Sequence, residues 1–398
     1  MKHLKQSLIT LAVCAATTSS FSVNADVLTE MLEGAKLYGD FRLRYESVDQ
    51  DNALDDASAL TLRSRIGFKT AEVNHFSATA EIEDSRVVLG EDDFSVPQTG
   101  FNTGEFSVVA DPEVTELDQA FVQYGTETLT AKLGRQVFVL DGQRFIGDVG
   151  WRQDRQTFDA LSVAYNPTKE ITVTGAYLDK RNRIFADDAD IDSKDFIGNV
   201  SFKTAIGKVV GYSYLLENEE NDTELDTYGI SLDGSAAINE KAKFLYHAEF
   251  ATQETDTDFD ADYLFLEAGV KVANITAKIG YELLGSDDGQ YGFSTPLATL
   301  HKFNGWADIF LNTPATGLED TYLSLSAKVG PGNATVVYHE FDTDEDTAAI
   351  SDLGSELDLQ YAFKFGKKYS AGIKAAFYSA DDVAVDTDKV WVWVSKAF

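Results

Sequence analysis

The chain has 398 residues and carries 66 acidic side chains against 33 Lys and Arg, a formal net charge of −33 at pH 7. So acidic a chain lacks the basic surface that nucleic-acid binding needs, which excludes nucleic acid as a partner. The single cysteine, Cys14, excludes a disulfide within the chain. After the first 25 residues, no apolar run is long enough for a transmembrane helix.

The N-terminus has the pattern of a secretory signal peptide. Lys2 and Lys5 form a positive region, residues 8–16 are apolar, and Val23-Asn24-Ala25 resembles a cleavage site. We therefore expect residues 1–25 to be a signal peptide and residues 26–398 to form a single domain. Cleavage would remove Cys14 and leave no thiol.

Segments of about ten residues with period-two alternation then recur along the chain, a pattern typical of strands in a transmembrane β-barrel. In residues 38–45 the apolar face is Phe41, Leu43 and Tyr45, and the polar face is Asp40, Arg42 and Arg44. Further segments of this kind are residues 60–69, 275–283, 322–329 and 356–365. A soluble sandwich also alternates, but here aromatic residues recur near the segment ends and no domain break appears. The sequence therefore predicts an all-β fold, a closed antiparallel transmembrane barrel.

The connections between these segments predict the number of strands. Eight are short, near residues 71–74, 125–127, 166–169, 205–207, 234–239, 273, 330–333 and 366–368. Nine are long or acidic, near residues 49–57, 89–114, 139–154, 180–192, 217–223, 252–259, 285–319, 342–354 and 380–386. Outer-membrane barrels alternate short periplasmic turns with long extracellular loops, so this count predicts about eighteen strands. If residues 301–311 formed a strand, the barrel would have an odd number of strands, and the short connection at 330–333 would lie on the outer side. Residues 285–319 are therefore expected to form one long outer loop.

The C-terminus fits the same fold. The chain ends at Phe398, shortly after the apolar run Val390-Trp391-Val392-Trp393-Val394. A terminal aromatic residue on a last strand is typical of the signal that the barrel-assembly machinery recognises. Lys396 departs from that signal, because an apolar residue is usual there. We expect the assembly machinery and outer-membrane lipid, including lipopolysaccharide, to be partners of the chain.

Two blocks resemble a known family. One runs from Gly134-Arg135-Gln136 through Asp141-Gly142-Gln143-Arg144-Phe145 to Trp151-Arg152-Gln153-Asp154-Arg155-Gln156-Thr157-Phe158-Asp159-Ala160. The other is His301-Lys302-Phe303-Asn304-Gly305-Trp306-Ala307-Asp308 with Thr313-Pro314 and Gly317-Leu318. Both are similar to the alginate-export porin family. The resemblance implies an eighteen-stranded outer-membrane barrel whose basic lumen passes an anionic polysaccharide. The acidity of this chain departs from that pattern.

Arginine is distributed unevenly, since all the arginines lie between Arg42 and Arg183. A basic side chain facing lipid near the midplane costs about 2–4 kcal/mol, so the strand arginines are expected to face the lumen. Arginine binds carboxylates through two hydrogen bonds, which suits an anion path. The predicted path is Arg42, Arg44, Arg63, Arg65, Arg135, Arg144, Arg152, Arg155, Arg181 and Arg183. The direction of Arg135 is ambiguous, because strand alternation puts it on the same face as the apolar residues Leu133 and Val137.

Several alternatives remain open at this level. The strand arginines could instead form a salt-bridge network in the lumen with Asp40, Glu46, Glu81 and Glu83. The acidic loops lack the pattern of a calcium-binding loop, so loosely bound divalent cations are expected there and no dedicated cofactor or metal. No catalytic motif appears, so an enzyme is not expected. The expected function is an outer-membrane porin for small anionic solutes or acidic saccharides; the alternatives are a general diffusion porin, or an adhesin or receptor.

Overall fold

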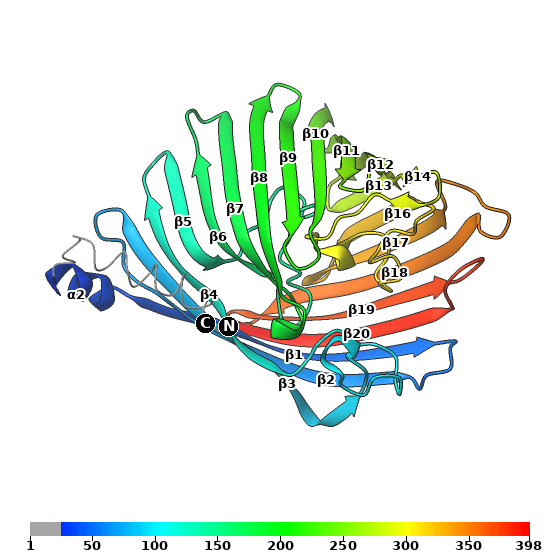
Figure 1. Ribbon diagram of the computed structural model, residues 1–398, viewed down its shortest axis with the longest axis horizontal. Coiled ribbons are helices and arrows are strands. Elements are labelled where there is room, and N and C mark those ends of the chain that lie inside the picture. Colours follow the sequence, from blue (N-terminus) through cyan, green and yellow to red (C-terminus); the bar gives the residue numbers. More distant parts are fainter. Residues whose placement is uncertain (1–24) are drawn as a thin grey trace.

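Eighteen strands of the chain form one closed antiparallel sheet, as seen in the computed structural model, which describes residues 25–398 (Figure 1). The predicted signal peptide lies outside the described residues except for its last one. The strand count, the antiparallel barrel and the long outer loop at 285–319 are therefore confirmed. Within residues 25–398, no helix combines the length and apolar character needed to cross a membrane.

The elements follow one another as a barrel of hairpins. Helix α2 (Ala25–Glu33) precedes the first strand. The barrel strands are β1 (Lys36–Gln50), β2 (Ala57–Lys69), β3 (Phe76–Asp93), β4 (Val114–Gly125), β5 (Leu129–Gln136), β6 (Thr157–Tyr165), β7 (Ile171–Asn182), β8 (Ile191–Thr204), β9 (Gly207–Asn218), β10 (Thr223–Asn239), β11 (Ala242–Thr255), β12 (Asp260–Val272), β13 (Ile275–Leu284), β16 (Leu318–Val329), β17 (Gly332–Asp342), β18 (Asp352–Phe365), β19 (Tyr369–Ser379) and β20 (Thr387–Ala397). The loops add β14 (Ser286–Asp287), β15 (Tyr291–Gly292) and the short helices η2 (Pro97–Thr99), η3 (Ala186–Asp188) and η4 (Leu300–Lys302).

The first and last strands close the barrel. β1 pairs with β2 on one side and with β20 on the other, in a register that runs from Asp40 opposite Ala397 to Gln50 opposite Thr387. The final residue continues this seam, because the Phe398 amide donates to the carbonyl of Gly39 at 3.0 Å. Closure leaves no sheet edge along this seam, as a membrane requires.

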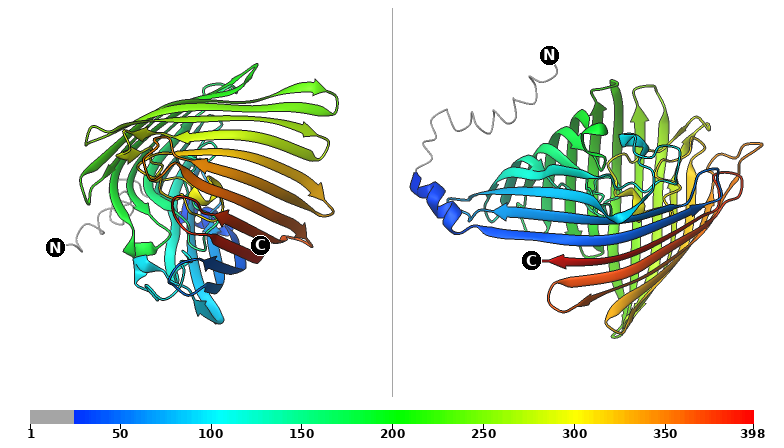
Figure 2. Two further views of the ribbon diagram at one scale, coloured as in Figure 1. Left: turned by 90° about the vertical axis from the view of Figure 1, so that its right-hand side faces the viewer. Right: turned by 90° about the horizontal axis from the view of Figure 1, so that it is seen from below.

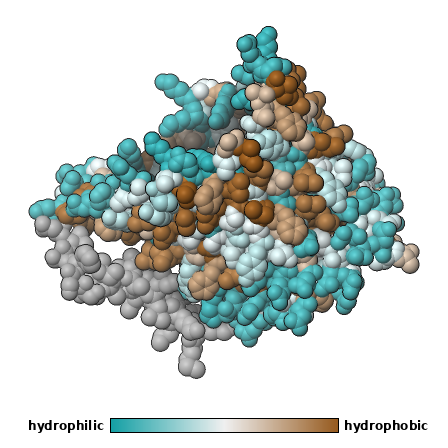
Figure 3. All heavy atoms as spheres, turned by 90° about the horizontal axis from the view of Figure 1, so that it is seen from above, coloured by the Kyte–Doolittle hydropathy of each residue, from teal (hydrophilic) through white to brown (hydrophobic). Residues whose placement is uncertain are grey.

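The burial pattern is inverted relative to a soluble protein. On β1 the apolar side chains Phe41 and Leu43 are exposed, whereas Arg42 and Arg44 are buried. The same inversion holds on β16, where Leu323 and Leu325 are exposed. Figure 3 shows apolar side chains spread over the outer surface, with hydrophilic ones at its margins. The alternation predicted from the sequence therefore places the apolar face toward lipid and the polar face toward the lumen.

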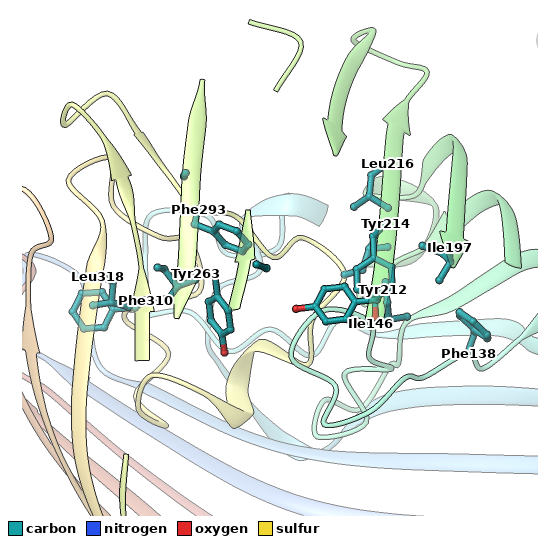
Figure 4. Packing of buried hydrophobic residues seen from close by; sticks show 14 of the residues in the cluster. Phe138, Ile146, Ile197, Tyr212, Tyr214, Leu216, Tyr263, Phe293, Phe310 and Leu318 are labelled. Atoms are coloured by element: carbon teal, nitrogen blue, oxygen red, sulfur yellow. The ribbon is translucent and has the colours of Figure 1, made fainter. Parts of the chain in front are cut away.

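The two ends of the barrel differ. Short turns such as 205–206 and 273–274 lie at one end, and the long connections lie at the other. Helix α2 lies beyond the strands at the turn end (Figure 2), where the Ala71 amide donates to the Met31 carbonyl at 2.9 Å. Two long connections, residues 137–156 and 285–317, enter the barrel and are called inner loop 1 and inner loop 2 below. Figure 4 shows Ile146 of inner loop 1 beside Tyr212 and Tyr214 of β9, all within the barrel.

Candidate channel constriction

The two inner loops bind each other across the lumen. The Gly147 amide donates to the Leu297 carbonyl at 2.8 Å, and Gln156 Nε2 donates to the same carbonyl at 3.1 Å. Gly147 must be glycine, because a Cβ at this position would collide with Thr299 of inner loop 2. These contacts join residues about 140–150 apart in sequence and narrow the channel from within.

Two arginines of β1 fix inner loop 1 to the wall. Arg42 Nε donates to Gln153 Oε1 at 2.9 Å, and its Nη2 donates to the Trp151 carbonyl at 2.7 Å. Arg44 also donates to the Trp151 carbonyl and forms a buried ion pair with Asp111. Both guanidinium groups face the lumen as predicted, but each is engaged in holding a loop.

Two arginines of inner loop 1 are likewise paired with carboxylates. Arg152 Nη1 lies 3.1 Å from Glu46 Oε1 on β1, and Arg152 Nη2 lies 2.5 Å from Asp308 of inner loop 2. The two acids raise the pKa of Arg152 against the opposing effect of burial. Arg155 Nε donates to both carboxylate oxygens of Asp118 on β4 at 3.1 Å. Arg152 therefore joins β1, inner loop 1 and inner loop 2.

The arginines of β2 belong to a further ion-pair network. Arg63 Nη2 lies 2.6 Å from Asp40 Oδ1, and Arg65 Nε lies 3.0 Å from the other oxygen of Asp40. Arg65 also lies 3.2 Å from Glu83 on β3. This arrangement matches the salt-bridge alternative and leaves little of either guanidinium for a passing anion.

A buried carboxyl group adjoins this network. Asp154 of inner loop 1 is fully buried, and within residues 25–398 neither of its carboxylate oxygens has a hydrogen-bond donor. Burial and the carboxylates of Glu116 and Glu83 raise the pKa of Asp154 well above its ordinary value. Over residues 25–398, no group of three or more His, Cys, Asp or Glu is arranged to hold a metal ion.

The two arginines near the β7–β8 loop differ from each other. Arg181 faces the lumen and donates two hydrogen bonds to Asp195 on β8, at 2.7 and 2.8 Å. Arg183 is half-buried, and its backbone amide donates to Asp190 at 2.8 Å. Burial and the neighbouring Arg181 lower the pKa of Arg183.

Arg135 lies on the outside of the barrel. It shares the outward face of β5 with Leu133, which is half exposed, and pairs with Asp159 at 2.8 Å. Asp159 in turn shares the outward face of β6 with Leu161. Charges flanked by lipid-facing leucines mark the edge of the apolar belt. The side chain of Arg135 therefore does not line the lumen, and it takes no part in the path proposed below.

A lysine surrounded by aromatic rings connects the inner loops to β19. Lys374 Nζ lies 3.8 Å from the ring centroid of Trp306 and 4.7 Å from that of Trp151. It also lies 2.7 Å from His301 Nε2, and Asp308 lies 2.7 Å from Nδ1 of the same ring. Burial and the ammonium of Lys374 lower the pKa of His301 to about 3. His301 is therefore neutral, accepting from Lys374 and donating to Asp308.

Below the inner loops lies a cavity of about 660 Å³, bounded by the wall from β9 to β17. Its charged lining residues are Asp141, Arg144, Lys208, Asp233, Glu249, Glu267, Lys278, Glu282, Lys302 and Asp320. Its aromatic lining residues are Phe145, Tyr214, His247, Tyr263, Phe265, Phe303, Trp306, Tyr322 and His339. Of the predicted arginines only Arg144 reaches it, held by Glu282 at 2.6 Å and by Asn304 at 3.2 Å.

Lys302 differs from every other permanent cation of this cavity. Arg144, Lys208 and Lys278 each lie within 3 Å of a carboxylate. Lys302 is exposed, and across the described chain no carboxylate lies within ion-pair distance of it; its ammonium donates to the Gly142 carbonyl at 2.7 Å. Partial burial and the nearby Lys278 lower the pKa of Lys302.

Apart from Arg144, the arginine-based prediction missed the residues that line this cavity. Lys302 could have been found, because it is the single Lys or Arg between residues 285 and 319. Lys374 has no comparable signal, since its contacts come from three separate stretches of sequence.

Comparisons with known proteins agree with the barrel. Residues 35–263 match the Alginate export family. Among solved structures, the chain is similar to OccAB4 of Acinetobacter baumannii (TM-score 0.72, 14% identity, covering 92% of this chain and 98% of that chain). It is also similar to OccK9 (OpdG) of Pseudomonas aeruginosa (TM-score 0.72, 12% identity, covering 92% of this chain and 100% of that chain). A third similar structure is OpdK of the same organism with vanillate (TM-score 0.72, 10% identity, covering 92% of this chain and 99% of that chain). A comparison with curated proteins finds no match.

These matches establish the class of protein. At such low identities, the solved structures show a shared fold, the eighteen-stranded barrel of outer-membrane porins. The protein is an outer-membrane porin and not an enzyme, located in the bacterial outer membrane. Because the family match covers more than half of its residues, the chain belongs to the Alginate export family.

Proposed function

We propose that this porin passes small anionic solutes, acidic saccharides among them, and that Lys302 receives the anionic group in the cavity below the inner loops. The observation that carries the proposal is the exposed ammonium of Lys302, which has no carboxylate partner among the described residues. An ammonium without a counter-ion can bind a carboxylate without first breaking an existing ion pair. Lys278 neighbours Lys302 but is paired with Glu267 at 2.9 Å, so Lys302 carries the proposal alone.

Aromatic rings near Lys302 offer a surface for the body of the solute. Phe303, Phe265 and Tyr322 line the cavity and are only partly buried. Flat apolar faces of this kind stack on sugar or aromatic rings. The similar porin OpdK was solved with vanillate, a ring that carries one carboxylate. Lys302 with these rings would suit a solute of that chemistry.

The arginines then have a different part in the proposed function from the one predicted. Arg42, Arg44 and Arg152 would set the size of the constriction by holding the inner loops, and Arg144 alone would adjoin the solute. A guanidinium that is already bonded to carboxylates contributes less to attracting an anion than an unpaired one, because its partner cancels most of the charge at a distance.

A general diffusion porin with weak charge preference is the second candidate. Six carboxylates line the cavity against four permanent cations, and this balance favours the second candidate over strong anion selectivity. The two candidates differ in whether one residue, Lys302, controls selectivity.

Planar-bilayer measurement of the reversal potential in a salt gradient separates the two candidates. For Lys302→Glu we expect the anion-to-cation permeability ratio to fall by about threefold or more at low salt, where screening is weak. Lys367→Glu, in the turn after β18, is the matched control and should leave the ratio unchanged. Equal ratios in the wild type and Lys302→Glu would favour the general porin, and absence of any open-channel current would contradict both candidates.

A further inference from the structure

The barrel wall is incomplete at one place near the loop end. β4 pairs with β3 from Val114 to Tyr124, but it pairs with β5 only from Ala120 to Gly125. β5 ends at Gln136, where inner loop 1 turns into the lumen. Within residues 25–398, residues 114–119 therefore have a neighbouring strand on one side and none on the other.

A cavity of about 830 Å³ lies at this gap, and we call it the β4 notch. Its lining residues are Phe94, Thr99, Gly100, Phe101, Pro112, Glu113, Val114, Thr115, Glu116, Leu117, Arg135, Phe185, Asp187 and Asp188. They come from β4, the end of β5, the β3–β4 loop and the β7–β8 loop. Leu117 is 46% exposed on the outer wall, so the notch opens at the upper border of the apolar belt.

The backbone of β4 faces this gap. Arg135 Nη1 donates to the Leu117 carbonyl at 3.1 Å, which shows that the polar backbone groups of Leu117 point toward the β5 side. By the alternation of a strand, those of Thr115 point the same way. Within residues 25–398, no backbone hydrogen bond reaches Thr115 from that side. An unpaired strand edge is a template for another extended segment.

The charge and the rings of the notch indicate what kind of segment would fit. Glu113, Glu116, Asp187 and Asp188 line it. Arg135, the one basic residue among the described lining residues, is already paired with Asp159, which lies outside the notch. The inner part is aromatic, with the rings of Phe94 and Phe101 5.2 Å apart and Phe185 packed against the same cluster. These features complement basic side chains along a segment and an apolar side chain directed inward.

We propose that the β4 notch binds an extended, basic polypeptide segment of a partner protein, which adds to residues 114–119 of β4 as a further strand. Main-chain hydrogen bonds to Thr115 and Leu117 provide the register, and the acids of the two loops attract the segment. This binding is independent of the solute that passes the channel, because the notch lies in the wall and not in the lumen cavity.

The test uses the full, folded protein and a fluorescent peptide, Lys-Val-Thr-Phe-Thr-Val-Lys, with a counterpart in which Glu replaces both Lys. We expect the basic peptide to bind and the acidic one not to bind. Neutralising the notch in the double variant Asp187→Asn, Asp188→Asn should weaken binding by about threefold to tenfold. The matched control, Glu220→Gln with Asp222→Asn in the β9–β10 loop, should bind as the wild type does.

Hydrogen exchange provides a readout that needs no variant. Adding the basic peptide should protect amides within residues 114–119 and leave those of residues 219–222 unchanged. Equal binding of the two peptides, an equal loss in the two double variants, or no protection in residues 114–119 would overturn the proposal. Binding in detergent that is lost in vesicles containing lipopolysaccharide would assign the notch to lipid and would also overturn it.

Discussion

The two sides of the lumen use positive charge in opposite ways. On the side formed by β1, β2 and inner loop 1, guanidinium groups such as those of Arg44 and Arg152 are buried and bonded to carboxylates. On the side formed by β12, β13 and inner loop 2, Lys302 is exposed and bonded to one backbone carbonyl. A buried cation requires partners and so becomes part of the framework, whereas an exposed ammonium can exchange its partner with a solute.

Among these predictions, removing a buried arginine that is bonded to a carboxylate should have the largest effect on stability and conductance. Arg44→Ala leaves Asp111 buried without its cation and removes one of the two arginine donors to the carbonyl of Trp151, so we expect a loss of about 3–5 kcal/mol in stability. Inner loop 1, still held by Arg42, should then loosen and single-channel conductance should rise. Arg86→Ala is the control, because Arg86 is exposed and its partner Asp84 is only partly buried, so that their pair contributes about 0–1 kcal/mol. Unchanged unfolding and conductance in Arg44→Ala would contradict the framework role.

Acid should loosen the inner loops through His301. Its pKa is about 3 in the folded protein against 6.5 ordinarily, so the unfolded chain binds the proton more readily. Stability is therefore fully present above pH 6.5 and falls by about 1.4 kcal/mol per pH unit as the pH drops toward 3. His301→Gln keeps one donor for Asp308 and one acceptor for Lys374 but cannot titrate. Thermal unfolding of both proteins between pH 7 and 4 measures the difference, and parallel losses in the two would refute this assignment.

Separating the two inner loops should have a smaller effect. Gly147→Ala places a methyl group against Thr299, and overpacking of this kind costs about 1–3 kcal/mol. We expect a wider, noisier channel in single-channel recordings. Gly142→Ala is the matched control, because a Cβ there meets no atom within 4 Å. Identical recordings from the two variants would show that this contact does not set the constriction.

Much of the barrel could be predicted from the sequence, because alternation and connection length are local properties. The alternating faces of β18 between Leu357 and Phe365 follow from a period of two, although the strand begins earlier, at Asp352. The number of short and long connections gave the strand number. The site was less predictable. The arginines of β1 and β2 were placed correctly on polar strand faces, and Glu46 was a candidate partner for them, but no local pattern shows that Asp111 of the β3–β4 loop neutralises Arg44.

The sequence by itself determined the fold class, the strand number and the direction in which most strand side chains face. These follow from the requirement that every backbone group be bonded in lipid and that apolar faces meet it. Only the tertiary structure decided which cations remain available to a solute. Lys302, Arg152 and Lys374 differ through partners brought from distant stretches of chain by the two inner loops. Charge in a lumen is set by such pairing, and pairing between distant residues leaves no periodic signal in a single sequence.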